Sequence, residues 1–436
     1  MATKAIARAV PVFSLLVLSI LSILSLLSAC GSCDGGANGD TSGPGAVAED
    51  AVTPLTEPWM RVIPFQETPE GLETIRAAEC GECHTEIYAE WQTATHAVAL
   101  QDRQFQAEWN KDDKLWLCAN CHTPLANQFE DVVVGLIDGD YRRPVTEHND
   151  RFDPVLQQES ITCATCHVRD GAILGPGFGG ESPHPVRVDP TVLSQQVCVA
   201  CHNVHARLSG TLVCNFSTGD EWAMGPAPRE GLGCIDCHMP TVERPIAEGG
   251  PVRTSHVHRW PGSGIAKFPE DVETVRGFYV PGYEIEVAAH RTETGGGEAA
   301  VAIELTVTNH RAGHVLPTGD VERFITMSLS IQSEDGVSLW DHEERFGERW
   351  EWHPEARQLS DNSLEPRVPR ELRFEAPLPA DQGGTGAPLF VEVIGQNHRM
   401  TEENAEGDGI LGQYPIAVET MRTRVEVMDQ EAPVSP

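Results

Sequence analysis

Two cysteines three positions apart, followed at once by a histidine, recur five times in this chain of 436 residues. The copies are "CGECH" (Cys80, Cys83, His84), "CANCH" (Cys118, Cys121, His122), "CATCH" (Cys163, Cys166, His167), "CVACH" (Cys198, Cys201, His202) and "CIDCH" (Cys234, Cys237, His238). Two thiols at this spacing reach the two vinyl groups of one haem, and the adjacent histidine then lies under the iron. The pattern therefore predicts covalent attachment of c-type haem.

Two other interpretations of the motif are weaker. A disulfide redox pair does not need a histidine at the next position in every copy. Zinc ribbons use four cysteines for each metal, which leaves the histidine without a role. We therefore predict five covalently bound c-type haems, with the ten motif cysteines as anchors and the five motif histidines as iron ligands.

A six-coordinate haem iron needs a second axial ligand, and twelve of the 17 histidines lie outside the motifs. His205 lies three residues after His202, so on a helix both point the same way, and His205 can serve only a neighbouring haem. His96 lies twelve residues after His84, which is about 18 Å along a helix that rises 1.5 Å per residue. We therefore expect His96 to reach a different haem from the one that His84 serves.

The other candidate ligands leave alternatives open. His256 and His258 are two residues apart and share one face of a strand, so adjacent haems or one ligand and one bystander are both possible, with His258 favoured. His314, in "NHRAGHVLPTGD", either pins its turn by hydrogen bonds or crosses to a haem and docks the two domains. His184 is a weaker candidate ligand.

The N-terminus predicts export. Lys4 and Arg8 precede the apolar run 11–27, which is typical of a signal peptide and slightly short for a membrane-spanning helix. The junction "LSAC" resembles a bacterial lipobox, which implies cleavage before Cys30 and lipidation of its thiol. We expect a membrane-anchored lipoprotein on the periplasmic side, at the outer membrane or at the cell surface.

The composition divides the chain into four parts. Residues 1–29 are the expected signal peptide, and residues 30–58 are an acidic tether rich in Gly, Ala and Pro. Residues 59–268 hold every motif, at intervals of roughly 35 to 45 residues, too short for each haem to have a domain of its own. We expect short helices and loops around closely packed haems, with His84, Tyr88 and Trp91 on one helical face.

Residues 269–436 contain no cysteine and alternate apolar with polar positions in several segments. The expected strands are 283–289, 301–309, 324–332, 371–377, 389–395 and 423–429, with "TETGGGEA" as a hairpin loop. They predict an antiparallel β-sandwich, so the whole chain has an α+β fold.

The formal charge of −34 and the pI near 4.7 argue against binding to nucleic acid, which requires a basic face. The expected partners are redox proteins and, through the lipid anchor, a membrane; the sequence does not indicate an oligomeric state. Cys33 and Cys214 remain outside the motifs, either as unpaired thiols or as a disulfide.

The stretches "CGECHTEIYAEWQTATHA", "ITCATCHVRDG", "CIDCHMP" and "HRWPG" make residues 76–265 resemble multihaem cytochromes c of the c-552/c-554 family. "AGHVLPTGD" is similar to a segment of related cytochromes with a C-terminal β domain. The resemblance implies electron transfer, with a residue at the place of His96 as distal ligand to another haem. The fifth motif and the β domain depart from the tetrahaem members.

The expected function is electron transport along closely packed haems. The alternative is a multihaem oxidoreductase in which one open haem acts on a small nitrogen compound or oxyanion. A third possibility is a haem-bearing assembly subunit that docks through its β domain.

Overall fold

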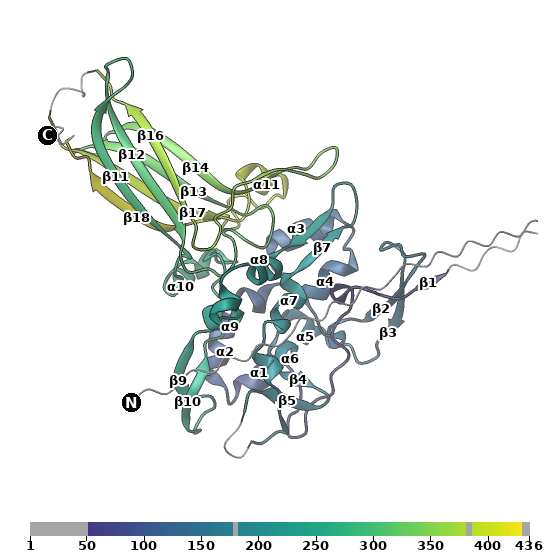
Figure 1. Cartoon of the computed structure of the whole chain (residues 1–436). Helices are drawn as coiled ribbons and strands as arrows, with labels where there is room; N and C mark the ends of the chain where they lie inside the picture. Colours follow the sequence, from purple (N-terminus) through teal and green to yellow (C-terminus); the bar gives the residue numbers. More distant parts are fainter. Residues whose placement is uncertain (1–50, 178–181, 381–385, 430–436) are drawn as a thin grey trace, which may run out of the picture. The chain divides into compact units, whose positions relative to one another are not determined.

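The structure is a computed structural model that describes residues 51–177, 182–380 and 386–429 (Figure 1). Asp50–Pro436 form one compact unit, so the division at residues 268/269 stays a prediction. In the described ranges, no helix has the length and apolar character needed to cross a bilayer. The expected signal peptide, Cys30 and Cys33 lie outside the described residues.

The part of the chain that carries the motifs consists of short helices and small sheets. The α-helices are α1 (Ala77–Gly81), α2 (Thr85–Gln92), α3 (Arg103–Lys111), α4 (Trp116–His122), α5 (Pro154–Gln158), α6 (Cys163–His167), α7 (Gln196–His202), α8 (Thr218–Met224), α9 (Cys234–His238) and α10 (Val272–Arg276). The 3₁₀ turns are η1 (Pro58–Met60), η2 (Thr95–Val98), η3 (Ala126–Gln128), η4 (Pro190–Leu193), η5 (Ala227–Glu230) and η6 (Pro269–Asp271).

Ten short strands lie among these helices and pair into four small sheets. They are β1 (Val52–Thr53), β2 (Asp131–Ile137), β3 (Pro144–His148), β4 (Val168–Arg169), β5 (Ala172–Gly175), β6 (Val186–Val188), β7 (Val204–Arg207), β8 (Val213–Phe216), β9 (Thr241–Pro245) and β10 (Val252–His256). The sheets have the orders β1-β2-β3, β4-β5-β6, β7-β8 and β10-β9. These small sheets were not expected from the sequence.

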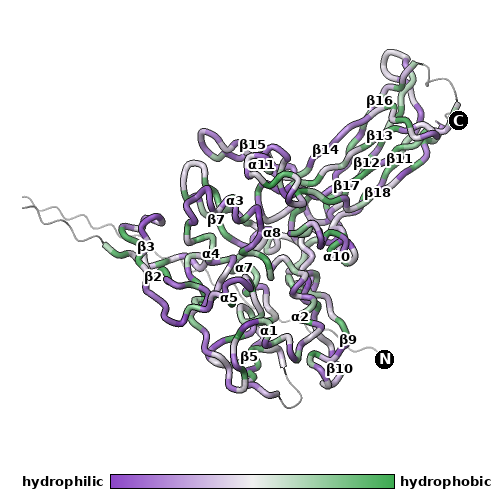
Figure 2. Tube along the Cα trace, turned by 180° about the vertical axis from the view of Figure 1, so that it is seen from behind, coloured by the Kyte–Doolittle hydropathy of each residue, from purple (hydrophilic) through white to green (hydrophobic). Residues whose placement is uncertain are grey.

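The C-terminal part is built from long antiparallel strands in two sheets, β11-β12-β16 and β15-β14-β13-β17-β18. They are β11 (Tyr283–Glu293), β12 (Ala299–Asn309), β13 (Phe324–Ser333), β14 (Ser338–Glu351), β15 (Arg357–Asp361), β16 (Pro369–Pro377), β17 (Leu389–His398) and β18 (Ala417–Glu426), with α11 (Glu402–Gly407) between β17 and β18. Their tube carries hydrophobic and hydrophilic segments in turn (Figure 2).

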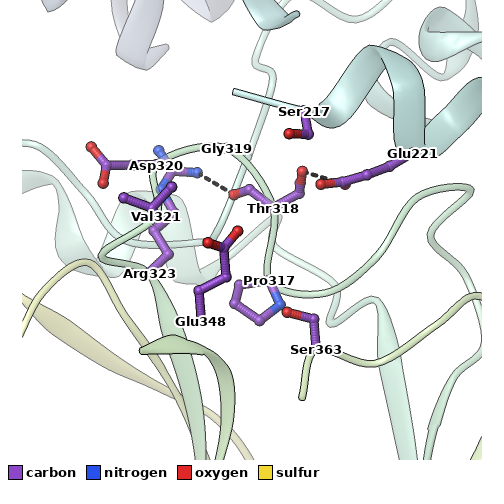
Figure 3. Close-up of a pocket in the computed structure, with 10 residues that line it drawn as sticks. All are labelled: Ser217, Glu221, Pro317, Thr318, Gly319, Asp320, Val321, Arg323, Glu348 and Ser363. Carbon is purple, nitrogen blue, oxygen red and sulfur yellow. Dashed lines mark hydrogen bonds between the residues drawn. The ribbon is translucent and has the colours of Figure 1, made fainter. Parts of the chain in front are cut away.

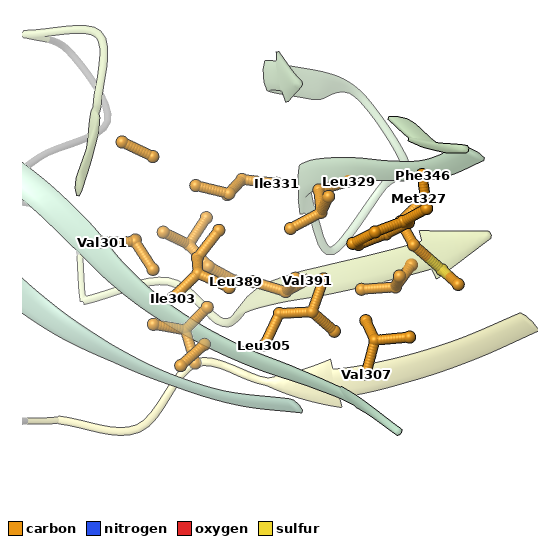
Figure 4. Packing of buried hydrophobic residues seen from close by; sticks show 14 of the residues in the cluster. Val301, Ile303, Leu305, Val307, Met327, Leu329, Ile331, Phe346, Leu389 and Val391 are labelled. Carbon is orange, nitrogen blue, oxygen red and sulfur yellow. The ribbon is translucent and has the colours of Figure 1, made fainter. Parts of the chain in front are cut away.

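The inner side chains of the two sheets form one large apolar core. Ile303 and Leu305 of β12 face Leu329 and Ile331 of β13, all at most 1% exposed (Figure 4). The alternate residues of each strand point outward, as a sheet with one buried face requires. The predicted β-sandwich is therefore observed, and the hairpin loop between β11 and β12 lies where it was expected.

The secondary structure differs from the expectation in several places. β14 and β15 were not predicted, because charged residues interrupt the alternation of β14 and every residue of β15 is exposed. β18 ends at Glu426, so the predicted strand 423–429 begins too late. The helix after the first motif stops at Gln92, and His96 lies in the separate turn η2, so the expected 18 Å separation along one helix is wrong.

A buried ion pair connects α2 with the β9–β10 hairpin. Arg244 donates to both carboxylate oxygens of Glu90, at 2.8 Å and 2.9 Å, and the backbone N–H of His258 donates to the same carboxylate at 2.9 Å. Burial raises the pKa of Glu90, but the hydrogen bonds from Arg244 and His258 outweigh it, so the pKa is lowered. This carboxylate therefore fixes the chain segment on which His258 lies.

Glu90→Gln is expected to lower the free energy of unfolding by about 3–5 kcal/mol at neutral pH, because it removes the buried counter-charge of Arg244 and leaves it only the exposed Glu86 carboxylate. The loss should shrink as the pH falls through the lowered pKa of Glu90, since the native carboxylate is then protonated in the parent protein also. Chemical denaturation at several pH values measures both effects. Glu86→Gln is the matched control, because the Glu86 side chain is 68% exposed and lies 3.7 Å from the same Arg244; an equal loss in both variants would contradict the prediction.

Candidate functional site

Each of the five motifs forms one helical turn. In α4, α6, α7 and α9 the motif histidine is the last helical residue. In the first motif, the backbone N–H of His84 donates to Cys80 at 2.9 Å, so the same turn forms there. Residues at positions i, i+3 and i+4 share one face of a helix, so each turn presents two thiols and an imidazole together.

Three motif histidines lie opposite a histidine from a distant part of the chain. The ring centres are 6.3 Å apart for His202 and His96, 6.3 Å for His167 and His258, and 6.2 Å for His238 and His314. A metal–imidazole bond is about 2 Å long, and the ring centre lies about 1.1 Å behind the nitrogen, so two axial imidazoles have centres about 6.3 Å apart. The three pairs therefore have the spacing of two ligands on opposite sides of one iron.

The hydrogen bonds of the imidazoles leave the other ring nitrogen available. His167, His258 and His314 direct Nδ1 to the carbonyl oxygens of Leu174, His256 and Val315, at 3.0 Å, 2.8 Å and 2.8 Å. A metal-bound histidine commonly donates its second N–H to a carbonyl, which orients the ring. Nε2 of each ring is then the free donor atom.

Two motif histidines have no imidazole at this separation among the described rings. His84 directs Nδ1 to the carbonyl oxygen of Ile246 at 2.5 Å. The pKa of His184 is lowered by burial and then by the charge of His84, so the side chains of His84 and His184 lie in the same region. His122 directs Nδ1 to Ala99 at 2.7 Å and stacks on Phe105, with ring centres 3.6 Å apart.

The structure gives His205 and His256 different surroundings from the paired rings. His205 is on β7, with a side chain 48% exposed, and its two ring nitrogens contact Asn215 at 2.6 Å and Asp220 at 2.9 Å. His256 directs Nδ1 to Met239 at 2.7 Å. Neither is opposite a second imidazole among the described rings, and their assignment as ligands stays a prediction.

The segment that carries His314 packs closely on α8 and η5. Thr318 donates to Glu221 at 2.6 Å (Figure 3). Its hydroxyl is also 2.7 Å from that of Thr218. A Cβ on Gly313 would lie 2.6 Å from that of Ala227, and a Cβ on Gly225 would lie 2.5 Å from the Gly313 oxygen. The two glycines therefore allow the approach that brings His314 to His238.

The thiols of different motifs are in contact. The side chains of Cys80 and Cys163, of Cys121 and Cys201, and of Cys198 and Cys234 lie close enough to shift each other's pKa values. The first motif thus lies beside the third, the second beside the fourth, and the fourth beside the fifth. The described cysteines, Cys214 included, form no disulfide with one another.

Aromatic rings line the same region. Tyr88 and Trp91 of α2 stack with centres 5.6 Å apart, as their spacing predicted. Trp260 lies 4.9 Å from His96 and 5.3 Å from His258, between two of the paired imidazoles. The described residues contain no group of three or more His, Cys, Asp and Glu side chains that could hold a metal ion directly.

The donor set fits c-type haem. A porphyrin supplies four of the six iron ligands, so two imidazoles from opposite sides complete the coordination and no larger protein cluster is needed. In the described structure this requirement is met by the three imidazole pairs, each beside the two thiols of a motif.

No protein-family model matches the chain, and no curated protein is found to be similar to it. Among solved structures, the chain is similar to a penta-heme cytochrome c552 from Thermochromatium tepidum. The sequence identity is 17% and the TM-score 0.57, and the match covers 83% of this chain and 100% of the other. The chain thus shares its fold with that cytochrome.

Proposed function

We propose that the protein is an exported, lipid-anchored cytochrome that holds five c-type haems and carries electrons between redox partner proteins. The observation that carries this proposal is the agreement of five Cys-x-x-Cys-His turns with three imidazole pairs 6.2–6.3 Å apart. A bound haem iron supplies one-electron oxidation and reduction. The chain holds the haems, supplies their axial ligands and determines which haems lie next to each other.

In this proposal the ten motif cysteines anchor the haems and the five motif histidines are the first axial ligands. His96 is the second ligand opposite His202, His258 opposite His167, and His314 opposite His238. His184 is the proposed second ligand opposite His84. Since bis-histidine ligation gives lower potentials than ligation by histidine and methionine, we expect low midpoint potentials.

The contacts between thiols support a proposed order of the attachment sites. Haems anchored at cysteines that lie close together would be neighbours. The neighbouring motifs are then the first and third, the second and fourth, and the fourth and fifth. Cys83 and Cys237, in the first and fifth motifs, are exposed, whereas the other motif cysteines are half-buried. We propose that electrons enter and leave at these two motifs, where a partner protein can come closest.

His96→Ala should convert one low-spin haem to high spin and let it bind carbon monoxide when reduced, because the imidazole opposite His202 is removed. His314→Ala should do the same at the haem of His238. Electron paramagnetic resonance of the oxidised proteins and carbon monoxide difference spectra measure both changes. The matched control is His148→Ala, because the His148 side chain is 59% exposed and contacts Asp131 at 3.2 Å. Spectra of His96→Ala and His314→Ala identical to the control would refute these ligand assignments.

A second candidate function is favoured by the surroundings of His122. Its ring contacts Phe105, and among the described rings no second imidazole is opposite it. A haem held there would have an open axial position, at which a small nitrogen compound or oxyanion could bind the iron. This is the oxidoreductase alternative that the sequence leaves open.

If that axial position is open, the unmodified reduced protein should bind about one carbon monoxide per chain, since an iron with one protein ligand accepts an external one. Titration with carbon monoxide, followed in the Soret band, counts the open sites. A protein that binds none and is entirely low-spin would leave electron transfer as its role and would eliminate the enzyme.

A further inference from the structure

Three cations gather where the C-terminal domain meets the N-terminus of α3. Arg399 is 3% exposed, and the Lys267 side chain is 12% exposed. Arg399 donates to the carbonyl oxygen of Ile265 at 2.5 Å, and its guanidinium packs 5.3 Å from the centre of the Tyr414 ring. Arg323 donates to the carbonyl oxygen of Thr318 at 3.4 Å.

Acidic side chains lie near these cations, and Glu221, Asp320 and Glu348 line one pocket with Arg323. Asp102 forms an ion pair with Lys267 and accepts a hydrogen bond from Tyr414 at 2.7 Å. The charge of Asp320, three residues earlier in the chain, favours the charged form of Arg323. Among the described residues no acceptor lies against the buried Nε of Arg399. An unpaired buried guanidinium donor is costly, and an anionic acceptor would remove that cost.

Mutual repulsion within the cluster is consistent with a missing anion. Burial, and then the charge of Arg399, lower the pKa of Lys267 to about 7 in spite of Asp102. The same two causes lower the pKa of Arg323. Lys267 and Arg323 therefore have less favourable surroundings than in water, and one further negative charge beside them would stabilise both.

The cluster lies beside the second motif. Asp102 caps α3 by accepting a hydrogen bond from the N–H of Gln104 at 3.2 Å, and Phe105 of the same first turn stacks on His122. His122 in turn directs Nδ1 to Ala99, three residues before Asp102. A haem held by Cys118, Cys121 and His122 would carry two propionate carboxylates, the kind of anion that these cations would pair with.

We propose that Arg399, Lys267 and Arg323 form a buried binding site for a carboxylate or similar oxyanion next to the second motif. The source nearest at hand is a propionate of the haem attached at Cys118 and Cys121, and a free small oxyanion has the same chemistry. The inference rests on the proposed function, because it requires a haem at this motif. It assigns to the β domain the role of neutralising the charge of that haem and tuning its potential.

The experiment uses the full-length holoprotein and its variant Arg399→Gln. Removal of a cation beside a haem favours the oxidised iron, which carries one more positive charge, so the midpoint potential of one haem should fall. Arg399→Lys keeps the charge and should keep the potential closer to that of the parent protein. Arg345→Gln is the matched control: Arg345 packs 4.3 Å from the Phe324 ring and also has a buried unpaired nitrogen, but lies inside the β domain. Its potentials should be unchanged.

Spectroelectrochemical titrations with and without added sodium acetate distinguish the two sources. A fall in potential that does not depend on acetate indicates a propionate, and a saturable acetate effect that disappears in Arg399→Gln indicates a free oxyanion. Potentials equal to those of the parent protein, with no acetate effect, would overturn the proposal. If Arg399→Gln does not fold, Lys267→Gln replaces it and should lower the same potential.

The haem content of each protein, measured first, distinguishes failure of the proposed function from failure of the anion site. A parent protein without a haem at the second motif would refute the proposed function. Full haem content with unchanged potentials would refute only the anion site.

Discussion

The distance between facing imidazoles is the constraint on which the rest of the structure depends. Three pairs of histidines, each from well-separated segments, have ring centres 6.2–6.3 Å apart. This separation is too wide for a direct hydrogen bond between the rings. It matches the distance between the ring centres of two imidazoles that bind one iron from opposite sides. Backbone carbonyl oxygens orient three of these rings. The Glu90–Arg244 ion pair fixes the segment that carries His258. The close contact between Gly313 and Gly225 lets the segment that carries His314 approach His238.

The two parts of the chain differ in what can hold them together. The sandwich has one continuous apolar core, from Tyr283 to Val427, and needs no other group. The motif-bearing part has only small clusters, such as Ala77, Trp91 and Ala97, or Met60, Leu115 and Leu117. So small a set of buried side chains stabilises little by itself. In the proposed holoprotein the porphyrins supply the missing apolar surface, so haem attachment and folding of this part depend on each other.

The sequence predicts the features that have a strict period or spacing. The motif turns follow from Cys-x-x-Cys-His, and most sandwich strands follow from alternation. Alternation fails at β14, where charges such as Glu343 and Glu344 interrupt it, and at β15, where every residue is exposed. His96, His258 and His314 could be named as candidate ligands, but their partners could not, because tertiary packing decides which imidazoles face each other. The proposed ligand His184 is only weakly marked in the sequence, because a proline follows it and the nearest regular element is the short strand β6. Arg399, Lys267 and Asp102 come together from distant segments and leave no local pattern.

The central claim is that all five motifs hold haem. Mass spectrometry of the mature, exported protein, together with a spectrophotometric count of haem per chain, tests it most directly. The account predicts five covalently bound haems on one chain. A mature protein with fewer than five covalently bound haems would contradict it.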